Sequence, residues 1–313
     1  MRYKQTPVDE FELIERFFNR RVAAPGVVVG IGDDGAVLQP TPGHEQVQVI
    51  DTLVEGVHFP ADSEAQDIGY RIVAVNLSDI AAMGAHPRWM TLALSMPSKT
   101  EQWLADFASG LFEAAAEFDV ALVGGDTTSG DAVVATVHVT GEVESGKALL
   151  RSGARVGDTI FVTGTLGDAA AGLELLGRGE RDSVLAHRFL RPTARIGTGQ
   201  QLVGRANAAI DVSDGLVGDL KKLLDASRVG GELDIDRVPL SDALKAGFDV
   251  PQRTLYALNG GDDYELCFTA RPDRVEGIAD ITAIGKVTGE PGLTCRENGV
   301  IVDWDDSGYR HFQ

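Results

Sequence analysis

The residues best suited to chemistry are aspartates that stand beside small residues at five places in the sequence. They are Asp33 with Asp34, Asp51, Asp79, Asp126, and Asp211 with Asp214. Each follows or lies within an apolar run, and the loops at the ends of buried strands commonly carry function. A single aspartate of this kind can be a simple turn or cap residue. Gathered together they would repel one another unless divalent cations lay among them, and Mg²⁺ prefers carboxylate oxygens.

The first of these places, Gly30-Ile31-Gly32-Asp33-Asp34-Gly35, also satisfies the dinucleotide pattern G-x-G-x-x-G. A dinucleotide site requires a helix that begins in the loop and receives the pyrophosphate at its N-terminus. The residues that follow, Ala36-Val37-Leu38, predict a short strand instead. The two aspartates would also face a pyrophosphate with like charge. We therefore favour a metal–phosphate loop, with a dinucleotide site or a plain acidic turn as the alternatives.

Length and composition limit the possible functions. The chain has 313 residues, of which 43% are hydrophobic. This length favours two domains, which we place at residues 1–148 and 149–313 because residues 151–158 are polar and contain glycine. The 47 acidic and 28 basic residues give a net charge of −19. Such a charge argues against binding to nucleic acid or to an anionic membrane surface, and an anionic substrate would need cations as intermediaries.

The two cysteines, Cys267 and Cys295, form neither a metal-binding pair nor a disulfide framework, which is typical of a reducing cytoplasm. No apolar run is long enough to span a membrane, and the N-terminus does not resemble a signal peptide. We therefore expect a cytoplasmic protein.

Apolar periodicity predicts the elements that must hold the aspartates. We expect helices over residues 9–21, 67–83, 100–118, 168–176, 194–205 and from 215 to 227. We expect strands over residues 27–30, 47–50, 89–96, 121–123, 133–139, 159–163, 208–210, 264–269, 281–287 and 300–304. Asp79 then lies inside a helix, whereas Asp51, Asp126 and Asp211 follow strands. Both halves of the chain mix strands with helices, so the fold class is α/β (α+β).

Phosphoryl transfer is the chemistry that needs several hard cations and few bases. The sequence contains no Walker A string and no protein-kinase H-R-D string. If the acceptor is itself a phosphate, its oxygen is already anionic and no general base is required. We therefore predict no catalytic acid or base. Arg151, near the domain boundary, is the arginine we expect to offset repulsion between two polyanions, and the alternative is a solvated surface arginine.

Three further residues have open alternatives. His58 follows a glycine loop near Asp51 and is either a substrate contact or a structural histidine. Ser213 either donates to a phosphate or caps the helix that follows it. Gly124-Gly125 would let backbone amides approach phosphate oxygens.

Taken in order, the motifs resemble the thiamine-monophosphate kinase family, part of the superfamily of aminoimidazole ribonucleotide synthetase and selenophosphate synthetase. The resemblance covers nearly the whole chain. It rests on Gly30–Asp34, Asp51–Val54, Asn76–Gly84, Gly124–Thr128, Asp211–Gly215 and Gly260–Glu265. It implies ATP-dependent phosphorylation of thiamine phosphate to thiamine diphosphate, by direct in-line transfer with Mg²⁺. It also implies a homodimer whose N-terminal domains join their sheets.

The resemblance further implies roles for particular residues. The implied metal ligands are Asp34, Asp51, Asp79, Asp126, Asp211 and Asp214. Gly125, Asp126, Arg151 and Ser213 would contact ATP, and His58, Asp262 and Tyr309 would contact thiamine phosphate.

The chain departs from the family pattern at three places. Val49 and Ile50 stand where Ser or Thr is common, so only a backbone carbonyl, as at Ile50, could bind a metal there. Asp262 replaces a glutamate. Asp305-Asp306-Ser307-Gly308 separates Trp304 from Tyr309, a longer spacing than the family pattern has. Either aromatic residue could stack on the substrate thiazolium, and we favour Tyr309.

Three alternative functions remain on sequence grounds. One is a sibling activity: selenophosphate synthetase would need a reactive cysteine and lysine near the N-terminus, which are missing, so aminoimidazole ribonucleotide synthetase is the stronger sibling. The second is a non-catalytic protein that binds nucleotides or cations. The third is an acidic two-domain protein whose aspartates merely cap helices.

Overall fold

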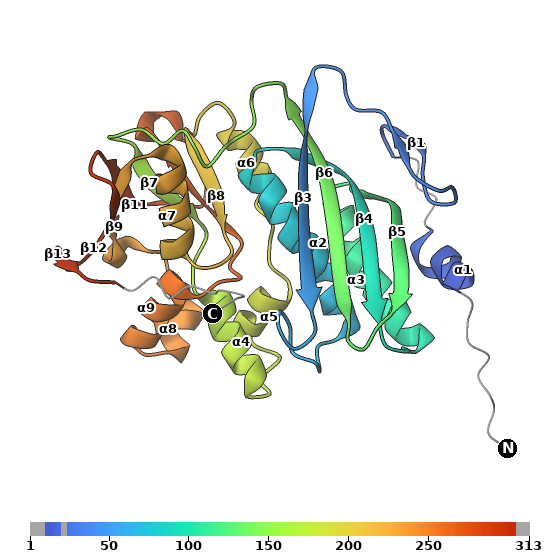
Figure 1. The fold of residues 1–313 in the computed structure, drawn as a ribbon. Coiled ribbons are helices and arrows are strands. Elements are labelled where there is room, and N and C mark those ends of the chain that lie inside the picture. The colour runs from blue at the N-terminus through green and yellow to red at the C-terminus, as the bar shows by residue number, and fades with distance from the viewer. Residues whose placement is uncertain (1–9, 20–23, 305–313) are drawn as a thin grey trace. The chain divides into compact units, whose positions relative to one another are not determined.

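A computed structural model describes residues 10–19 and 24–304 (Figure 1). Its backbone contacts divide the chain into two units. Unit 1 is the described part of Met1–Asn76 together with Pro87–Glu142, and unit 2 is Leu77–His86 with the described part of Val143–Gln313. The predicted division into domains 1–148 and 149–313 stays a prediction. The predicted fold class is confirmed, because strands and helices alternate in both units.

Unit 1 is built on a four-stranded sheet in the order β3-β6-β4-β5. Its elements are α1 (Glu10–Leu13), a π-helix (Ile14–Phe18), β1 (Val27–Val29), β2 (Val37–Leu38), β3 (His44–Val54), α2 (Ala65–Ala82), β4 (His86–Met96), α3 (Glu101–Ala116), β5 (Ala121–Ser129) and β6 (Val134–Glu144). Helices α2 and α3 lie behind this sheet in Figure 1. Strands β4 and β5 run parallel, with Ala93 opposite Asp126. This pairing fixes Asp126 within the sheet and not on a free loop.

Helix α2 is buried on nearly all sides, which requires close packing against α3. A Cβ atom on Gly69 would collide with the Phe107 carbonyl oxygen, and one on Gly110 would collide with the Gln66 carbonyl oxygen. The two glycines therefore let the helix backbones touch. This contact holds the first part of α2 in unit 1, and the chain enters unit 2 at Leu77 within the same helix.

Unit 2 contains a seven-stranded sheet in the order β13-β12-β9-β11-β7-β10-β8. Its elements are β7 (Thr159–Thr163), α4 (Asp168–Gly177), α5 (Val184–Leu190), α6 (Ile196–Leu202), β8 (Ala208–Val212), α7 (Leu216–Ser227), β9 (Gly230–Asp234), a 3₁₀ helix (Ile235–Arg237), α8 (Asp242–Gly247), α9 (Val250–Asn259), β10 (Glu265–Ala270), a 3₁₀ helix (Pro272–Arg274), β11 (Ile281–Thr288), β12 (Gly292–Glu297) and β13 (Val300–Val302). Helix α7 packs against the sheet through Leu220, Leu223 and Leu224, which meet Ile160 and Leu233 in the core. The edge strand β8, paired antiparallel with β10, carries Asp211.

Most predicted elements are confirmed, and several strands end later than predicted. Asp51 does not follow a strand, because β3 continues to Val54, and Asp126 lies inside β5, which continues to Ser129. Asp211 likewise lies within β8, before its last residue. In each case polar residues continue the ladder because backbone hydrogen bonds to neighbouring strands outweigh their weak strand preference.

The predicted helix over residues 9–21 is α1 followed by the π-helix, which ends at Phe18, and residues 20–23 lie outside the described part. The predicted helix over 194–205 is the shorter α6. The elements α5, α8, α9, β9 and β12 were not predicted. The dinucleotide alternative is wrong, because the Gly30–Gly35 loop leads into the strand β2 and not into a helix.

Within the described residues, no helix combines the length and the apolar character needed to cross a bilayer.

Candidate functional site

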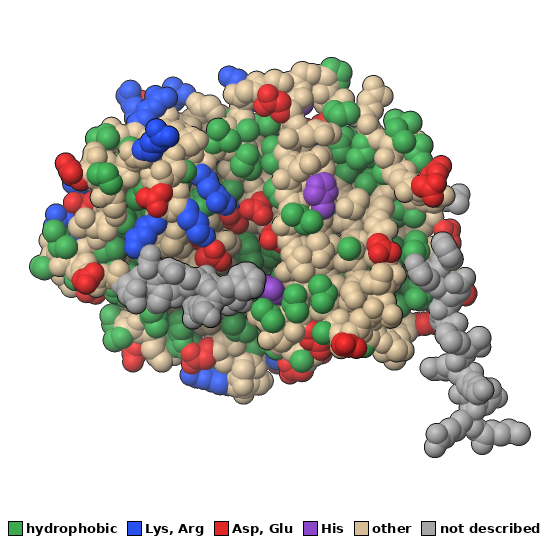
Figure 2. All heavy atoms as spheres, in the orientation of Figure 1, with side chains coloured by type: hydrophobic (Ala, Val, Ile, Leu, Met, Phe, Trp, Pro, Cys, Tyr) green, Lys and Arg blue, Asp and Glu red, His purple; other side chains and the backbone are tan. Residues whose placement is uncertain are grey.

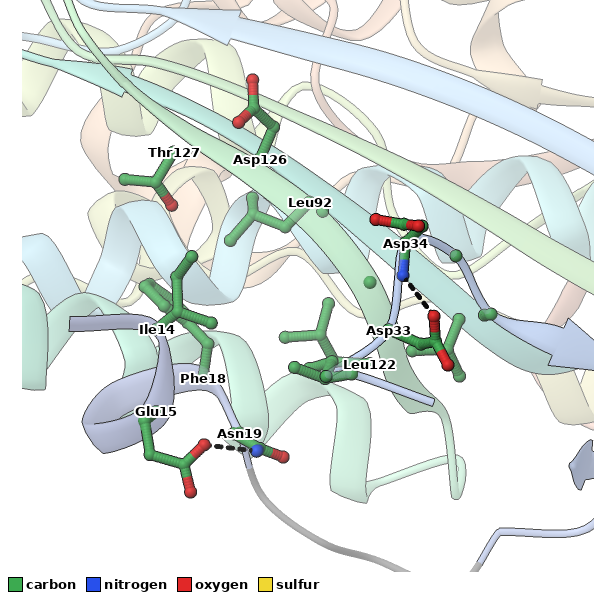
Figure 3. Close-up of a pocket in the computed structure, with 17 residues that line it drawn as sticks. Ile14, Glu15, Phe18, Asn19, Asp33, Asp34, Leu92, Leu122, Asp126 and Thr127 are labelled. Atoms are coloured by element: carbon green, nitrogen blue, oxygen red, sulfur yellow. Dashed lines mark hydrogen bonds between the residues drawn. The ribbon is translucent and has the colours of Figure 1, made fainter. Parts of the chain in front are cut away.

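Unit 1 contains a cavity of about 700 Å³ beside the predicted metal–phosphate loop. Asp33 and Asp34 from the loop and Asp126 from β5 line it, together with apolar side chains from the N-terminal helical segment and from β4 and β5. In Figure 3 the carboxylates of Asp34 and Asp126 are seen on the loop and on β5, and Ile14 and Phe18 lie across the cavity from Asp34. The cavity therefore offers carboxylates at one side and an apolar wall at another.

Two backbone features shape the acidic side of this cavity. The Asp34 amide donates a hydrogen bond to Oδ1 of Asp33 at 2.8 Å, which holds the turn and leaves the exposed Asp34 carboxylate at the cavity. A Cβ atom on Gly125 would collide with the Leu92 carbonyl oxygen. Only glycine therefore permits β5 to lie this close to β4 directly before Asp126.

In unit 2, Asp211 lies on β8 and is only 4% exposed. Oδ2 of Asp211 accepts a hydrogen bond from the Ser78 hydroxyl at 2.8 Å, although the two residues are 133 positions apart. Ser78 and the partly buried Asp79 lie on the last part of α2, which belongs to the same unit. The structure thus brings the third and fifth motifs of the resemblance, Asn76–Gly84 and Asp211–Gly215, together at one buried place.

The electrostatics of this place are unfavourable for a bare carboxylate. Burial, and next the charge of Asp79, raise the pKa of Asp211 to about 8, while the Ser78 hydrogen bond and Arg151 act in the opposite direction. Two adjacent carboxyl groups in a buried setting resist ionisation together. A divalent cation would remove that conflict, and carboxylate oxygens are the ligands Mg²⁺ prefers. The residues at this place therefore fit Mg²⁺.

The loop after β8, residues 213–215, is held by Asp219 in the first turn of α7. One carboxylate oxygen of Asp219, Oδ2, accepts the backbone N–H groups of Ser213 at 3.0 Å and Asp214 at 2.9 Å. Lys222 donates to Asp214 at 2.6 Å and to Asp219 at 2.8 Å. The alternative that Ser213 caps the helix is wrong, because Gly215 holds the cap position without a side-chain hydrogen bond.

The Gly260–Tyr264 loop packs against this same loop. The Asp262 amide donates to the Ser213 carbonyl at 2.9 Å, and the Tyr264 hydroxyl donates to the Asp262 carboxylate at 3.1 Å. Asp262 has a positive φ of 70°, which its short polar side chain tolerates. A residue predicted to contact ATP and one predicted to contact thiamine phosphate are therefore neighbours.

The other predicted residues are placed as follows. Asp51 is partly buried inside β3, whereas the neighbouring Ile50 side chain is 64% exposed. His58 Nδ1 accepts the backbone N–H of Val54 at 3.0 Å, so the neutral ring carries its proton on Nε2. Arg151 is exposed, and its charge acts on Asp211.

The two aromatic candidates differ. The indole N–H of Trp304 donates to the Asn259 side chain at 2.6 Å, and its ring packs against the core of unit 2. This gives Trp304 a structural role. Tyr309 lies outside the described residues, so the prediction that it stacks on the substrate stays a prediction.

No cluster of three or more His, Cys, Asp or Glu side chains able to hold one metal ion occurs among residues 10–19 and 24–304. Asp33, Asp34 and Asp126 instead line the cavity of unit 1 without forming such a cluster, and Asp79 and Asp211 are a pair in unit 2. None of the predicted metal ligands occupies the cap of a described helix, which contradicts the helix-cap alternative.

Sequence reasoning missed Ser78, Asp219 and Lys222. Ser78 stands within the Asn76–Gly84 motif, but nothing local shows that its hydroxyl reaches Asp211. The signal for the other two was the spacing of three between Asp219 and Lys222 in a predicted helix, which brings their side chains onto one face.

Comparisons with known proteins identify the family of this chain. The family models "AIR synthase related protein, N-terminal domain" and "AIR synthase related protein, C-terminal domain" match residues 32–143 and 155–297. Thiamine-monophosphate kinase of Salmonella typhimurium is 44% identical, over 97% of this chain and 98% of that protein.

Two solved structures extend the comparison. Thiamine-monophosphate kinase from Stenotrophomonas maltophilia K279a is 43% identical with a TM-score of 0.85, over 93% of this chain and 96% of that one. The structure of AaThiL complexed with AMPPCP and TMP is 34% identical with a TM-score of 0.80, over 97% of each chain. Since relatives of this kind align with it over almost its whole length, the chain belongs to the thiamine-monophosphate kinase family.

Proposed function

We propose that this chain catalyses the ATP-dependent phosphorylation of thiamine phosphate to thiamine diphosphate. The observation that carries the proposal is the buried pairing of Ser78 and Asp79 with Asp211, in a chain whose full-length relatives are thiamine-monophosphate kinases. The related structure that holds AMPPCP and TMP supports both substrates. The retained carboxylates and the full-length relatives argue against a non-catalytic binding protein and against aminoimidazole ribonucleotide synthetase activity.

The proposed metal ligands are Asp34, Asp51, Asp79, Asp126, Asp211 and Asp214, with the Ile50 carbonyl as a further candidate. When bound, Mg²⁺ would neutralise charge on the two polyanionic substrates and so permit their approach. The buried carboxyl group of Asp211 must give up its proton to serve as a ligand, and Ser78 keeps one of its oxygens oriented.

The proposed substrate contacts divide between the two units. In unit 1, the backbone at Gly125 and the apolar wall of the cavity would receive ATP, with the adenine ring on the side of Ile14 and Phe18. In unit 2, Arg151 and the Ser213 hydroxyl would bind phosphate oxygens. Asp262, His58 and Tyr309 would hold thiamine phosphate. No side chain is assigned as a general acid or base, because the acceptor oxygen is already anionic.

The family resemblance also implies a homodimer formed through the sheet of unit 1. The exposed Ile50 on β3 supports this, since burial of such a side chain in an interface would be favourable. Sedimentation equilibrium of the full chain tests it, and a monomer at micromolar concentration would contradict it. A cytoplasmic location stays a prediction.

The decisive experiment is an assay of the purified chain with ATP, Mg²⁺ and thiamine phosphate, with thiamine diphosphate measured by chromatography. We expect one thiamine diphosphate per ADP, and loss of turnover in Asp211→Asn with the fold retained by circular dichroism. Formation of ADP only with another substrate would overturn the proposal, and unchanged turnover in Asp211→Asn would remove Asp211 from the site.

A further inference from the structure

Lys222 on α7 places a positive charge within an acidic group of unit 2. Its ammonium nitrogen lies 2.6 Å from Oδ2 of Asp214 and 2.8 Å from Oδ1 of Asp219. Figure 2 shows blue basic side chains beside red acidic ones over the part of the surface where α7 lies in Figure 1. Lys222 therefore bridges one carboxylate on the 213–215 loop and one on the helix.

Asp219 explains why the lysine is held in this position. Asp219 is 1% exposed, and its second oxygen accepts two backbone N–H groups of the loop. A buried carboxylate of this kind needs a counter-charge. Lys222 supplies it, because its ammonium donates hydrogen bonds to both carboxylates.

The consequence concerns Asp214, which our proposed function assigns as a metal ligand. Its side chain is 41% exposed, and one of its oxygens is occupied by the Lys222 ammonium. A divalent cation that bound the same carboxylate would lie close to the Lys222 ammonium, and the two positive charges would repel each other.

On the basis of that proposed function, we propose that Lys222 is a positioning residue. It holds Asp214 when no metal is bound, and Mg²⁺ must displace the Lys222 ammonium from Asp214 in order to bind there. The lysine thereby raises the Mg²⁺ concentration that the site requires. Its long flexible stem allows the ammonium to leave Asp214 while remaining near Asp219.

Calorimetric titration of the full chain with Mg²⁺, without nucleotide, tests this competition. In Lys222→Met we expect the dissociation constant for Mg²⁺ to fall about fivefold, the factor that corresponds to loss of a half-exposed ion pair. Lys221→Met is the matched control, since it removes the same charge from the adjacent position of the same helix, and we expect a smaller change. A second readout is thermal unfolding in EDTA, in which Lys222→Met should melt at a lower temperature because Asp219 loses its partner.

Equal Mg²⁺ dissociation constants for Lys222→Met and Lys221→Met would overturn the proposal. If Lys222→Met does not fold, Lys222→Gln retains a donor for Asp219 and takes its place. Asp214→Asn separates the two levels of the argument. If Asp214→Asn leaves Mg²⁺ binding unchanged, the assignment of Asp214 as a ligand fails. If it weakens binding while Lys222→Met does not strengthen it, only the competition fails.

Discussion

The carboxylates of the two units differ in what neutralises them. In unit 1, Asp33, Asp34 and Asp126 are exposed around the cavity. In unit 2 several acidic side chains are buried, and groups of the chain itself pair with them. Asp219 has Lys222, Asp263 accepts the backbone N–H groups of Gly167 and Ala169, and Glu265 is bound by Arg188 and Arg195.

This difference separates two uses of the same chemical group. A carboxylate that folding removes from water must find its partner within the chain, because an unpaired buried charge is very unfavourable. A carboxylate that stays exposed is hydrated by solvent and remains available to a ligand. Asp211 belongs to neither class: it is buried, yet beside it lies another acid, Asp79. That mismatch is what supports the proposed role of Asp211 as a metal ligand.

The largest effect should come from breaking a buried pair in unit 2. Glu265→Gln leaves the Arg188 and Arg195 guanidinium groups without a full counter-charge, and we expect a loss of about 3 kcal/mol in the free energy of unfolding. Urea unfolding followed by circular dichroism measures it. The exposed Glu276 provides the matched control, and Glu276→Gln should change stability by less than about 0.5 kcal/mol. Equal effects of the two substitutions would refute the distinction.

The opposite pattern is expected for an exposed acid of unit 1. Asp126→Asn should lower kcat/KM for thiamine diphosphate formation by about 100-fold or more, because a proposed metal ligand loses its charge. Its melting temperature should stay within a degree or two of the parent's, since Asp126 is exposed. The exposed Asp131 lies in the same unit, and Asp131→Asn should leave kcat/KM unchanged. A melting temperature that falls together with activity would show that Asp126 acts through the fold.

Substitution of Glu142 tests whether unit 1 also provides hydrogen-bond and ion-pair partners for an acidic side chain that it buries. Its carboxylate accepts from the Thr41 amide at 2.7 Å and hydroxyl at 2.6 Å and from Arg88 at 3.0 Å. Burial opposes ionisation, but these partners outweigh it and lower the pKa of Glu142. We expect Glu142→Gln to cost about 2 kcal/mol at pH 7.

The pH dependence of that cost has a definite sign. A lowered pKa in the folded state gives stability that is complete above the unfolded-state value of 4.5 and is lost as the pH falls through the folded-state value. The difference in unfolding free energy between the parent and Glu142→Gln should therefore shrink below about pH 4.5. A difference that is constant from pH 7 to pH 3 would contradict the ion-pair explanation.

The smallest effect is expected for thiol chemistry in the folded chain. Cys267 and Cys295 are buried in unit 2, and burial raises the pKa of Cys267 to about 12. A disulfide reagent at pH 8 should therefore react with neither thiol until the chain unfolds. Because both cysteines lie in unit 2, their reaction rate also reports the opening of that unit in Glu265→Gln. Rapid labelling of the folded parent chain would contradict this prediction, because it would show that the reagent reaches the buried thiols without unfolding.

The sequence alone determined the residue types and local patterns on which the site depends. Repeated aspartates beside small residues indicated cation-assisted phosphoryl transfer, and the strand predicted after Gly35 argued against a dinucleotide site. Apolar periodicity located the long helices α2, α3 and α7, because each buries a large surface with a regular repeat. Shorter elements such as α5 and α8 were missed, since one or two turns carry too little periodic signal.

Only the tertiary structure decided which of these residues meet. Ser78 reaches Asp211 across 133 positions of the chain, the last part of α2 packs with unit 2, and Asp262 lies against Ser213. The Lys222 ammonium contacts Asp214, which the family resemblance assigned as a metal ligand. Such contacts depend on how sheets and helices pack, and packing between distant segments leaves no local pattern from which they could be predicted.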